Sequence, residues 1–110
     1  MKVHILYILL IVPILMTAQV QVNEIFADNG DCCLDGALET EDFVELINTG
    51  DFPVDLAGYY FGDQDGGSTI PSGFPELTTI SAGSVIVLWF DKDLDQGPLH
   101  IDAKLNNNGE

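Results

Sequence analysis

Hydrophobic and polar residues alternate in short runs after position 18, and turn-forming residues separate these runs. A period of two places every second side chain on the same face of an extended strand. Residues 20–26 (VQVNEIF) fit this pattern and predict a strand in which Val20, Val22 and Phe26 face one way. Residues 27–40 are rich in glycine and aspartate and have no period, so we expect a loop there.

Residues 41–48 (EDFVELIN) predict a second strand with two different faces. One face carries Phe43, Glu45 and Ile47, and the other carries Val44 and Leu46. Asn and Gly tolerate the positive φ of tight turns, so residues 48–51 (NTGD) predict a turn. The second strand therefore ends at a sharp reversal of the chain.

Residues 52–63 extend this framework with an edge segment and an aromatic strand. Pro53 cannot donate a ladder hydrogen bond, which restricts residues 52–56 to an edge position. Residues 59–61 (YYF) predict the next strand. We expect the rest of the chain to pack around the segment from 41 to 63.

The second half of the chain contains a run, residues 85–90 (VIVLWF), that is apolar at every position. Such a run predicts a strand covered on both faces; a buried helix is the alternative, but β-branched and aromatic members favour a strand. The remaining predictions are a loop over 62–75, a strand over 77–80, a turn over 81–84, an acidic loop over 91–98 and a strand over 99–105 with Leu99, Ile101 and Ala103 inward.

Short strands divided by turns, with no 3.6-residue amphipathic pattern after position 18, predict an all-β, immunoglobulin-like β-sandwich. The chain ends at residues 106–110 (NNNGE), and Asn-Gly is a strong hairpin signal that no return strand follows. We therefore expect a domain truncated at its C-terminus, with its last strands missing; a polar tail is the alternative.

Residues 1–18 have the outline of a secretory signal peptide. Lys2 precedes an apolar run of about 12 residues, too short to span a bilayer as a helix, and Thr17-Ala18 offers a cleavage site. An uncleaved anchor is the alternative. Cleavage would leave residues 19–110 as one domain of a secreted or cell-surface protein, with no membrane span.

The net charge of the chain is −15, and removal of the leader leaves 2 basic and 18 acidic residues, or −16. Such a surface repels phosphate backbones, which argues against nucleic-acid binding. It suits partners with basic patches or divalent cations, although acidic residues also simply increase solubility.

Two cysteines, Cys32 and Cys33, are adjacent in the first loop. Export implies an oxidising compartment, where they could close a vicinal ring, stay reduced or pair elsewhere. Without C-x-x-C spacing, the sequence supports neither a zinc site nor a thioredoxin-type motif.

Alternating acids in residues 91–97 (DKDLDQG) resemble the front half of a calcium loop. The candidate calcium ligands are Asp91, Asp93, Asp95 and Asp102. Gly97 comes one place too late for an EF-hand, so an irregular calcium loop competes with a solvated acidic loop. Weaker candidate groups are Asp63 with Asp65, and Asp28, Asp31, Asp35 and Glu39.

The chain has few side chains suited to catalysis, because His100 is the one histidine that remains after cleavage and the chain has no arginine. No G-x-S-x-G motif is present, and an incomplete small sandwich lacks an evident cleft for paired carboxylates. We assign no catalytic or cofactor-binding residue and expect no enzyme and no cofactor other than calcium.

Several residues are expected to have structural roles. Glu24 and Glu45 lie inside strands, either as outward-facing charges or as acceptors for turn amides. Tyr59, Tyr60, Phe61 and Trp89 could form a platform for sugar stacking, but core packing is the simpler use. The full structural set is Glu24, Phe43, Glu45, Leu46, Asn48, Leu56, Gly58, Tyr59 and Trp89.

Short motifs occur in a specific order along the chain. They are VNEI (22–25), DFVELINTG (42–50), VDLAGYYFGD (54–63), WFDKD (89–93), QGPLH (96–100), KL (104–105) and GE (109–110), and they extend over nearly all of residues 20–110. Their order resembles the lamin tail domain family, in particular its bacterial secreted branch. The Cys32-Cys33 pair is a departure from the pattern.

This resemblance implies an immunoglobulin-like sandwich that serves as a non-catalytic interaction or scaffold module of larger exported proteins. It also implies that a strand following Gly109-Glu110 completes the sheet. The expected partner is a protein or a cell surface, and the alternative is a calcium-stabilised module that binds glycans or surfaces. Nucleic-acid contacts of nuclear relatives are not expected here, because the charge opposes them.

Overall fold

The computed structural model describes residues 19–27 and 33–105, and the expectations for the leader, Asp28, Asp31, Cys32 and residues 106–110 lie outside this range. Its elements are β1 (Val20–Phe26), β2 (Phe43–Asn48), β3 (Val54–Asp55), β4 (Tyr60–Asp63), β5 (Gly66–Thr69), α1 (Pro75–Thr78), β6 (Thr79–Ile80), β7 (Val85–Phe90), the 3-10 turn η1 (Leu94–Gln96) and β8 (His100–Ile101). Within the described ranges, no helix is long and apolar enough to cross a membrane.

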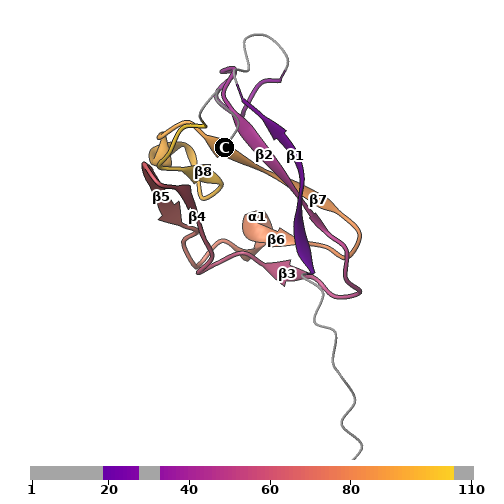
Figure 1. Cartoon of the computed structure of the whole chain (residues 1–110). Coiled ribbons are helices and arrows are strands. Elements are labelled where there is room, and N and C mark those ends of the chain that lie inside the picture. The colour runs from indigo at the N-terminus through magenta and orange to yellow at the C-terminus, as the bar shows by residue number, and fades with distance from the viewer. Residues whose placement is uncertain (1–18, 28–32, 106–110) are drawn as a thin grey trace, which may run out of the picture.

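Strands in two layers form the fold (Figure 1). The larger sheet has the order β1-β2-β7-β8, in which β1, β2 and β7 are antiparallel and β8 runs parallel to β7. The pairs β3–β6 and β4–β5 lie on one side of it. The predicted all-β sandwich is therefore confirmed.

Apolar side chains from both layers form one core. Its buried members are Val44, Leu46, Leu56, Ile70, Ile80, Leu88, Phe90, Ile101 and Ala103. Cross-strand pairing sets Val44 opposite Leu88, so the face of β2 predicted to carry Val44 and Leu46 lies on the core side of the sheet, together with Leu88 of β7. Burial of each large side chain contributes about 1.5–3 kcal/mol, which makes this shared core the main stabilising feature.

An irregularity in β1 changes which of its residues face the core. The register pairs Val22 with Leu46, Glu24 with Glu45, Ile25 with Val44 and Phe26 with Phe43, and it shifts between Val22 and Glu24. An extra residue in one strand reverses the faces of everything after it. Val22 and Ile25 therefore share the inner face, and the prediction that Phe26 faces the same way as Val22 is wrong.

The structure also corrects two other segments. Within the predicted loop 62–75, β5 pairs with β4, and a Cβ on Gly62 or Gly67 would collide with the backbone of the partner strand. The glycines that suggested a loop thus allow a close strand pair. The predicted strand 77–80 begins as α1, because Pro75 has a φ suited to the first helical position, and only β6 is extended.

Asn48, which is fully buried, joins the end of β2 to the other layer. Its Nδ2 donates to the carbonyls of Phe52 (2.8 Å) and Ile80 (2.9 Å). The Gly50 amide donates to its Oδ1 (3.0 Å). One side chain therefore fixes the predicted turn and ties it to β6.

We expect Asn48→Asp to destabilise the fold by about 3 kcal/mol, because a carboxylate cannot donate to two buried carbonyls and is itself buried. Gln19→Glu is the matched control, since the Gln19 amide donates to the same Phe52 carbonyl but in an exposed setting (2.6 Å). Urea unfolding of both variants measures the difference. Equal losses in the two variants would contradict the role given to Asn48.

Candidate functional site

Acidic residues from distant parts of the chain converge beside the C-terminal end of β7. Asp91 directly follows β7, and His100 begins β8. Parallel pairing sets His100 opposite Trp89, so the connection through η1 returns the chain to the place where β7 ends. The loop between β1 and β2 supplies the third side, with Asp35.

Asp91 and His100 form a buried, hydrogen-bonded pair. His100 Nδ1 donates to Asp91 Oδ2 over 2.6 Å, with 9% and 0% of the two side chains exposed. The Asp93 amide donates to the other oxygen, Asp91 Oδ1 (3.0 Å). Both carboxylate oxygens of Asp91 therefore have partners, and the imidazole is held in a fixed orientation.

Asp35 organises the first loop but keeps one oxygen without a partner. Its Oδ1 accepts hydrogen bonds from the amides of Ala37 (2.8 Å) and Glu39 (3.0 Å), which closes a tight local turn. Only 5% of the residue is exposed. Its Oδ2 is buried and has no hydrogen-bond partner among the described residues.

The ligand-capable atoms of Asp35, Asp91 and His100 all lie within 4.8 Å of one another, and all three residues are buried. We call this group the buried triad. Two carboxylates and one imidazole leave a surplus of negative charge away from water, which is costly without a further cation or proton. The arrangement can hold a divalent ion or a shared proton.

A second group, Glu39, Glu41 and Asp93, lies nearer the surface, again with ligand-capable atoms within 4.8 Å. Gln96 connects to it, because its Nε2 donates to Glu39 Oε1 (3.2 Å) and lies 3.5 Å from Asp93 Oδ2. Partial burial, followed by the charges of Asp91, Glu39 and Asp95, raises the pKa of Asp93. Burial also raises the pKa of Glu41, although Lys104 opposes the shift.

The four predicted calcium ligands do not meet in one group. Asp91 belongs to the buried triad and Asp93 to the second group, whereas Asp95 and Asp102 belong to neither. Asp95 is exposed, and the exposed Asp102 donates its backbone amide to Ser68 Oγ (3.0 Å). Asp63, of the weaker 63–65 signal, accepts from the amides of Asp65 and Gly66 and so shapes the β4–β5 turn.

The predicted first-loop group is represented in both clusters, since Asp35 joins the triad and Glu39 the second group. The positions of His100, Glu41 and Gln96 along the chain did not predict that they are neighbours of these acids. No regular spacing relates them, and only the parallel return of β8 brings His100 to Asp91. A prediction that β8 pairs in parallel with β7 would have indicated that His100 lies near Asp91.

The predicted structural residues occupy different environments. Leu46 and Leu56 lie in the core, while Phe43 stacks on Phe26 (5.3 Å) and meets Trp89 edge-on (5.5 Å) on the outer face of the larger sheet. Glu24 lies opposite Glu45, whose Oε1 accepts from Asn23 Nδ2 (2.6 Å). Gly58 has a φ of 85°, which favours glycine at the turn before β4.

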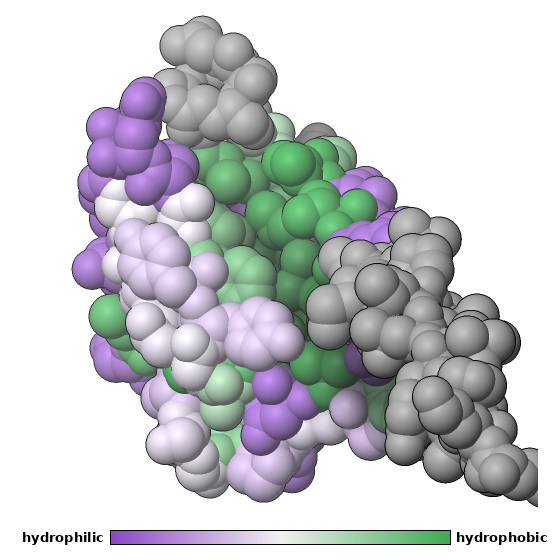
Figure 2. Space-filling model, turned by 60° about the horizontal axis from the view of Figure 1, so that its bottom comes forward, coloured by the Kyte–Doolittle hydropathy of each residue, from purple (hydrophilic) through white to green (hydrophobic). Residues whose placement is uncertain are grey.

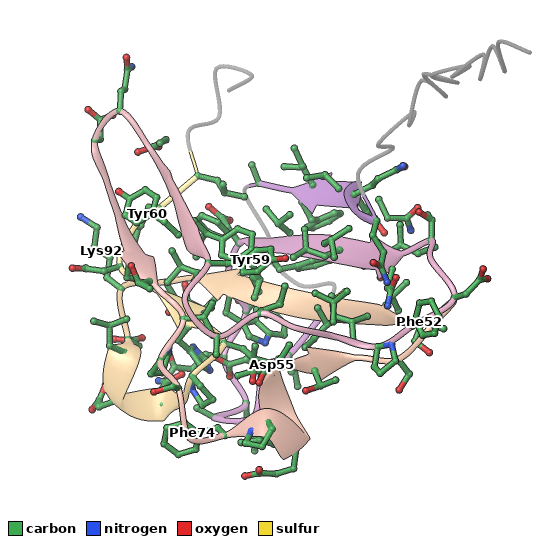
Figure 3. All side chains as sticks on the ribbon, turned by 90° about the horizontal axis from the view of Figure 1, so that it is seen from below. Phe52, Asp55, Tyr59, Tyr60, Phe74 and Lys92 are labelled. Carbon is green, nitrogen blue, oxygen red and sulfur yellow. The ribbon has the colours of Figure 1, made fainter. Side chains whose placement is uncertain are left out.

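Tyr59 and Tyr60 lie at the surface instead of in the core, where simple packing would have put them (Figure 3). Tyr59 stacks on Phe61, with ring centroids 6.4 Å apart. Cys33 is disulfide-bonded, which excludes the reduced state among the alternatives left open for it.

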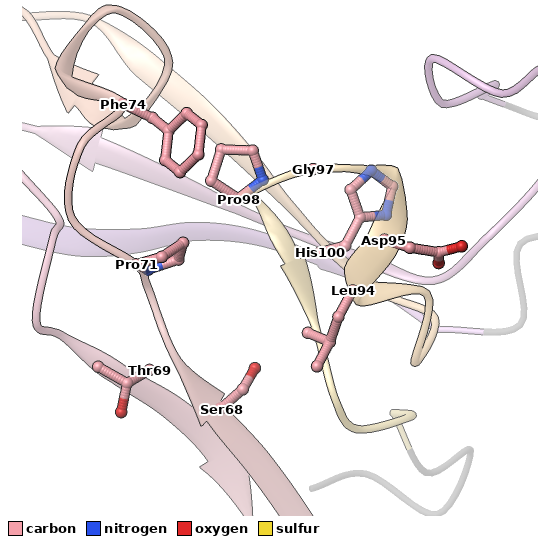
Figure 4. Close-up of a pocket in the computed structure, with 9 residues that line it drawn as sticks. All are labelled: Ser68, Thr69, Pro71, Phe74, Leu94, Asp95, Gly97, Pro98 and His100. Carbon is pink, nitrogen blue, oxygen red and sulfur yellow. The ribbon is translucent and has the colours of Figure 1, made fainter.

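A cavity of about 480 Å³ opens beside His100 (Figure 4). Its lining residues are Ser68, Thr69, Pro71, Phe74, Leu94, Asp95, Gly97, Pro98 and His100. Most of them are apolar or uncharged. The imidazole thus forms part of the wall between this cavity and the buried carboxylates.

Burial of the Glu41 carboxyl, together with the nearby carboxylates, predicts that Glu41→Gln stabilises the protein at pH 7. The raised pKa of Glu41 means that its ionised form is disfavoured in the folded state, so the cost is present above the folded pKa. The gain should shrink as the pH falls toward the ordinary value of 4.5, where the native carboxyl is already protonated. Thermal unfolding from pH 4 to 8 measures this, with exposed Asp51→Asn as the control; a pH-independent gain would contradict the explanation.

Comparison with known proteins agrees with the motif order. A family model described as Lamin Tail Domain matches residues 16–110, which include all the strands described above. No curated protein and no solved structure matches the chain. Immunoglobulin-like sandwich architecture, motif order and family match agree, and the chain belongs to the Lamin Tail Domain family.

Proposed function

We propose that this chain is a non-catalytic, exported interaction module of a larger secreted or cell-surface protein. It binds an extended protein segment along β1. The observation that carries this proposal is an apolar groove on the inner face of the larger sheet, beside an edge strand. The interaction role of immunoglobulin-like lamin tail domains supports it at the level of the family.

The groove has a volume of about 220 Å³ and lies where the second layer does not cover β1. Its lining residues are Val22, Ile25, Val44, Leu46, Phe61, Gly62, Asp63, Phe90 and Leu105. Val22 is 58% exposed and Ile25 52% exposed, although both face inward. Apolar residues gather in a continuous band on the face shown in Figure 2, with polar residues along its left side. Exposed apolar surface of this kind marks interaction sites.

The shape and charge of this surface specify its partner. β1 is an edge of the sheet formed by the described residues, so a new strand can add to it by main-chain hydrogen bonds. Alternate side chains of that strand would then enter the groove. With a net charge of −15, the protein attracts basic residues at the positions between them. The proposed ligand is therefore an extended segment with alternating apolar and basic residues.

A second candidate function is glycan binding by a cation-stabilised module. Tyr59 and Tyr60 expose aromatic rings at the start of β4, and stacking of Tyr59 on Phe61 supports one of them. Exposed aromatic rings can stack on the apolar faces of sugars. Loss of glycan retention in Tyr60→Ala, with peptide binding unchanged, would favour this candidate over the groove.

The groove can be tested with a ten-residue peptide of alternating valine and lysine, followed by fluorescence anisotropy. We expect Ile25→Glu to weaken binding at least about tenfold, because a carboxylate in the groove opposes burial of valine. Val85→Glu adds the same charge at a similarly exposed position on the outer face and should retain binding. If the peptide does not bind, or if both variants lose it equally, the proposed function is wrong.

A further inference from the structure

We propose that Asp35, Asp91 and His100 form a divalent-cation site that anchors the first long loop to the β7–β8 edge. The inference is independent of the groove and of the proposed function. Zinc is the cation that the donor set favours. The three residues come from the loop, from the residue after β7 and from the start of β8, so one ion would join three separate segments.

The first support for this assignment is the short distance between the ligand-capable atoms. The three ligand-capable atoms lie within 4.8 Å of one another and belong to buried residues. Donors around a tetrahedral zinc ion are roughly 3.4 Å apart, given metal–donor distances near 2.1 Å. Small side-chain rotations are therefore sufficient, and the backbone that carries the residues is already in place.

Two oxygens without partners are the second and independent observation. Asp35 Oδ2 and Gln96 Oε1 are the buried side-chain atoms in the described ranges that have no hydrogen-bond partner. Both are acceptors. Asp35 Oδ2 belongs to the triad, whereas Gln96 Oε1 belongs to a side chain that contacts the neighbouring second group. The Gln96 amide is oriented by its donation to Glu39, so an amide flip would place its nitrogen away from that carboxylate. Buried acceptors without donors are what a cation satisfies.

The charges around the triad also favour a cation. The second group, Glu39, Glu41 and Asp93, lies beside it and adds negative potential. Lys92 and Lys104 have exposed side chains, and Lys104 acts on Glu41. Within the described ranges, the His100 imidazole is the basic side chain that contacts Asp91. A divalent ion would compensate the remaining charge.

The donor types select among cations. Calcium and magnesium prefer oxygen ligands throughout, whereas imidazole favours zinc and related transition metals. The 2.6 Å contact between His100 Nδ1 and Asp91 Oδ2 admits two arrangements. Either zinc replaces the shared proton, or the imidazole binds through Nε2 while Asp91 orients it. Both arrangements require Asp35 and His100.

The test uses thermal unfolding of the metal-stripped protein with zinc, manganese or calcium chloride added separately. We expect zinc, at about a hundredfold excess over Kd, to raise the midpoint by at least about 5 °C, because it binds only the folded state. Asp35→Asn should raise the metal-free midpoint, since it removes a buried charge while keeping Oδ1 for the loop amides. The same variant should lose the zinc shift.

Glu76→Gln, an exposed carboxylate on α1, is the control and should keep the full zinc shift. A direct readout is the ¹⁵N resonance of the His100 ring, assigned by comparison with His100→Gln, which should move on zinc addition. A zinc shift that persists in Asp35→Asn, or an unchanged ring resonance, would overturn the site. A shift with calcium alone would also overturn it, because that would indicate the oxygen-only group at Glu39, Glu41 and Asp93.

Discussion

The antiparallel pairing of β2 with β7 is the interaction on which the other parts of this molecule depend. It sets Val44 opposite Leu88 and Leu46 opposite Ile86 on the core side, and Phe43 opposite Trp89 on the other. β1 and β8 then add to the two sides of this pair. At one end of β2, Asn48 ties the sheet to β6; at the other, Asp91 leaves β7 and begins the acidic region. The core, the groove and the triad are therefore all positioned by one register.

A surplus of negative charge is the second constraint on this fold. Asp35, Asp63 and Asp91 accept hydrogen bonds from nearby backbone amides. These hydrogen bonds stabilise the local turns. Near the end of β7, however, acids from two segments come together, and the raised pKa values of Glu41 and Asp93 reflect burial and like-charge repulsion. This unfavourable electrostatic free energy arises where the loop between β1 and β2 meets the larger sheet. A cation there would turn a repulsive contact into an attachment for the loop.

The groove and the triad lie at different parts of the larger sheet and involve different physics. The groove, beside β1, depends on apolar area and a strand edge. The triad, beside β8, depends on charge compensation in a buried setting. A module with a metal-anchored loop and a strand-binding edge would combine a rigid frame with an adaptable interface. Because the two share no residue, each can be altered without the other.

The sequence alone determined the local features of this protein. The alternation in residues 41–48 gave the two faces of β2, the apolar run gave β7, and the order of short motifs indicated the family. Prediction from the sequence failed at two places. The bulge in β1 places Phe26 on the opposite face from Val22, and Gly66-Gly67 lie in strand β5 instead of a loop. Such features are decided by the fit of one strand against another.

The site belongs to tertiary structure even more than these strands do. Sequence spacing grouped Asp91 with Asp93, Asp95 and Asp102, because these residues are close along the chain. The fold instead joins Asp91 to His100 and Asp35, since β8 returns parallel to β7 and the first loop packs against that end. The sequence could supply the acids, but only the three-dimensional path of the chain decided which of them are buried together. Burial is what makes their charges matter, because water no longer screens them.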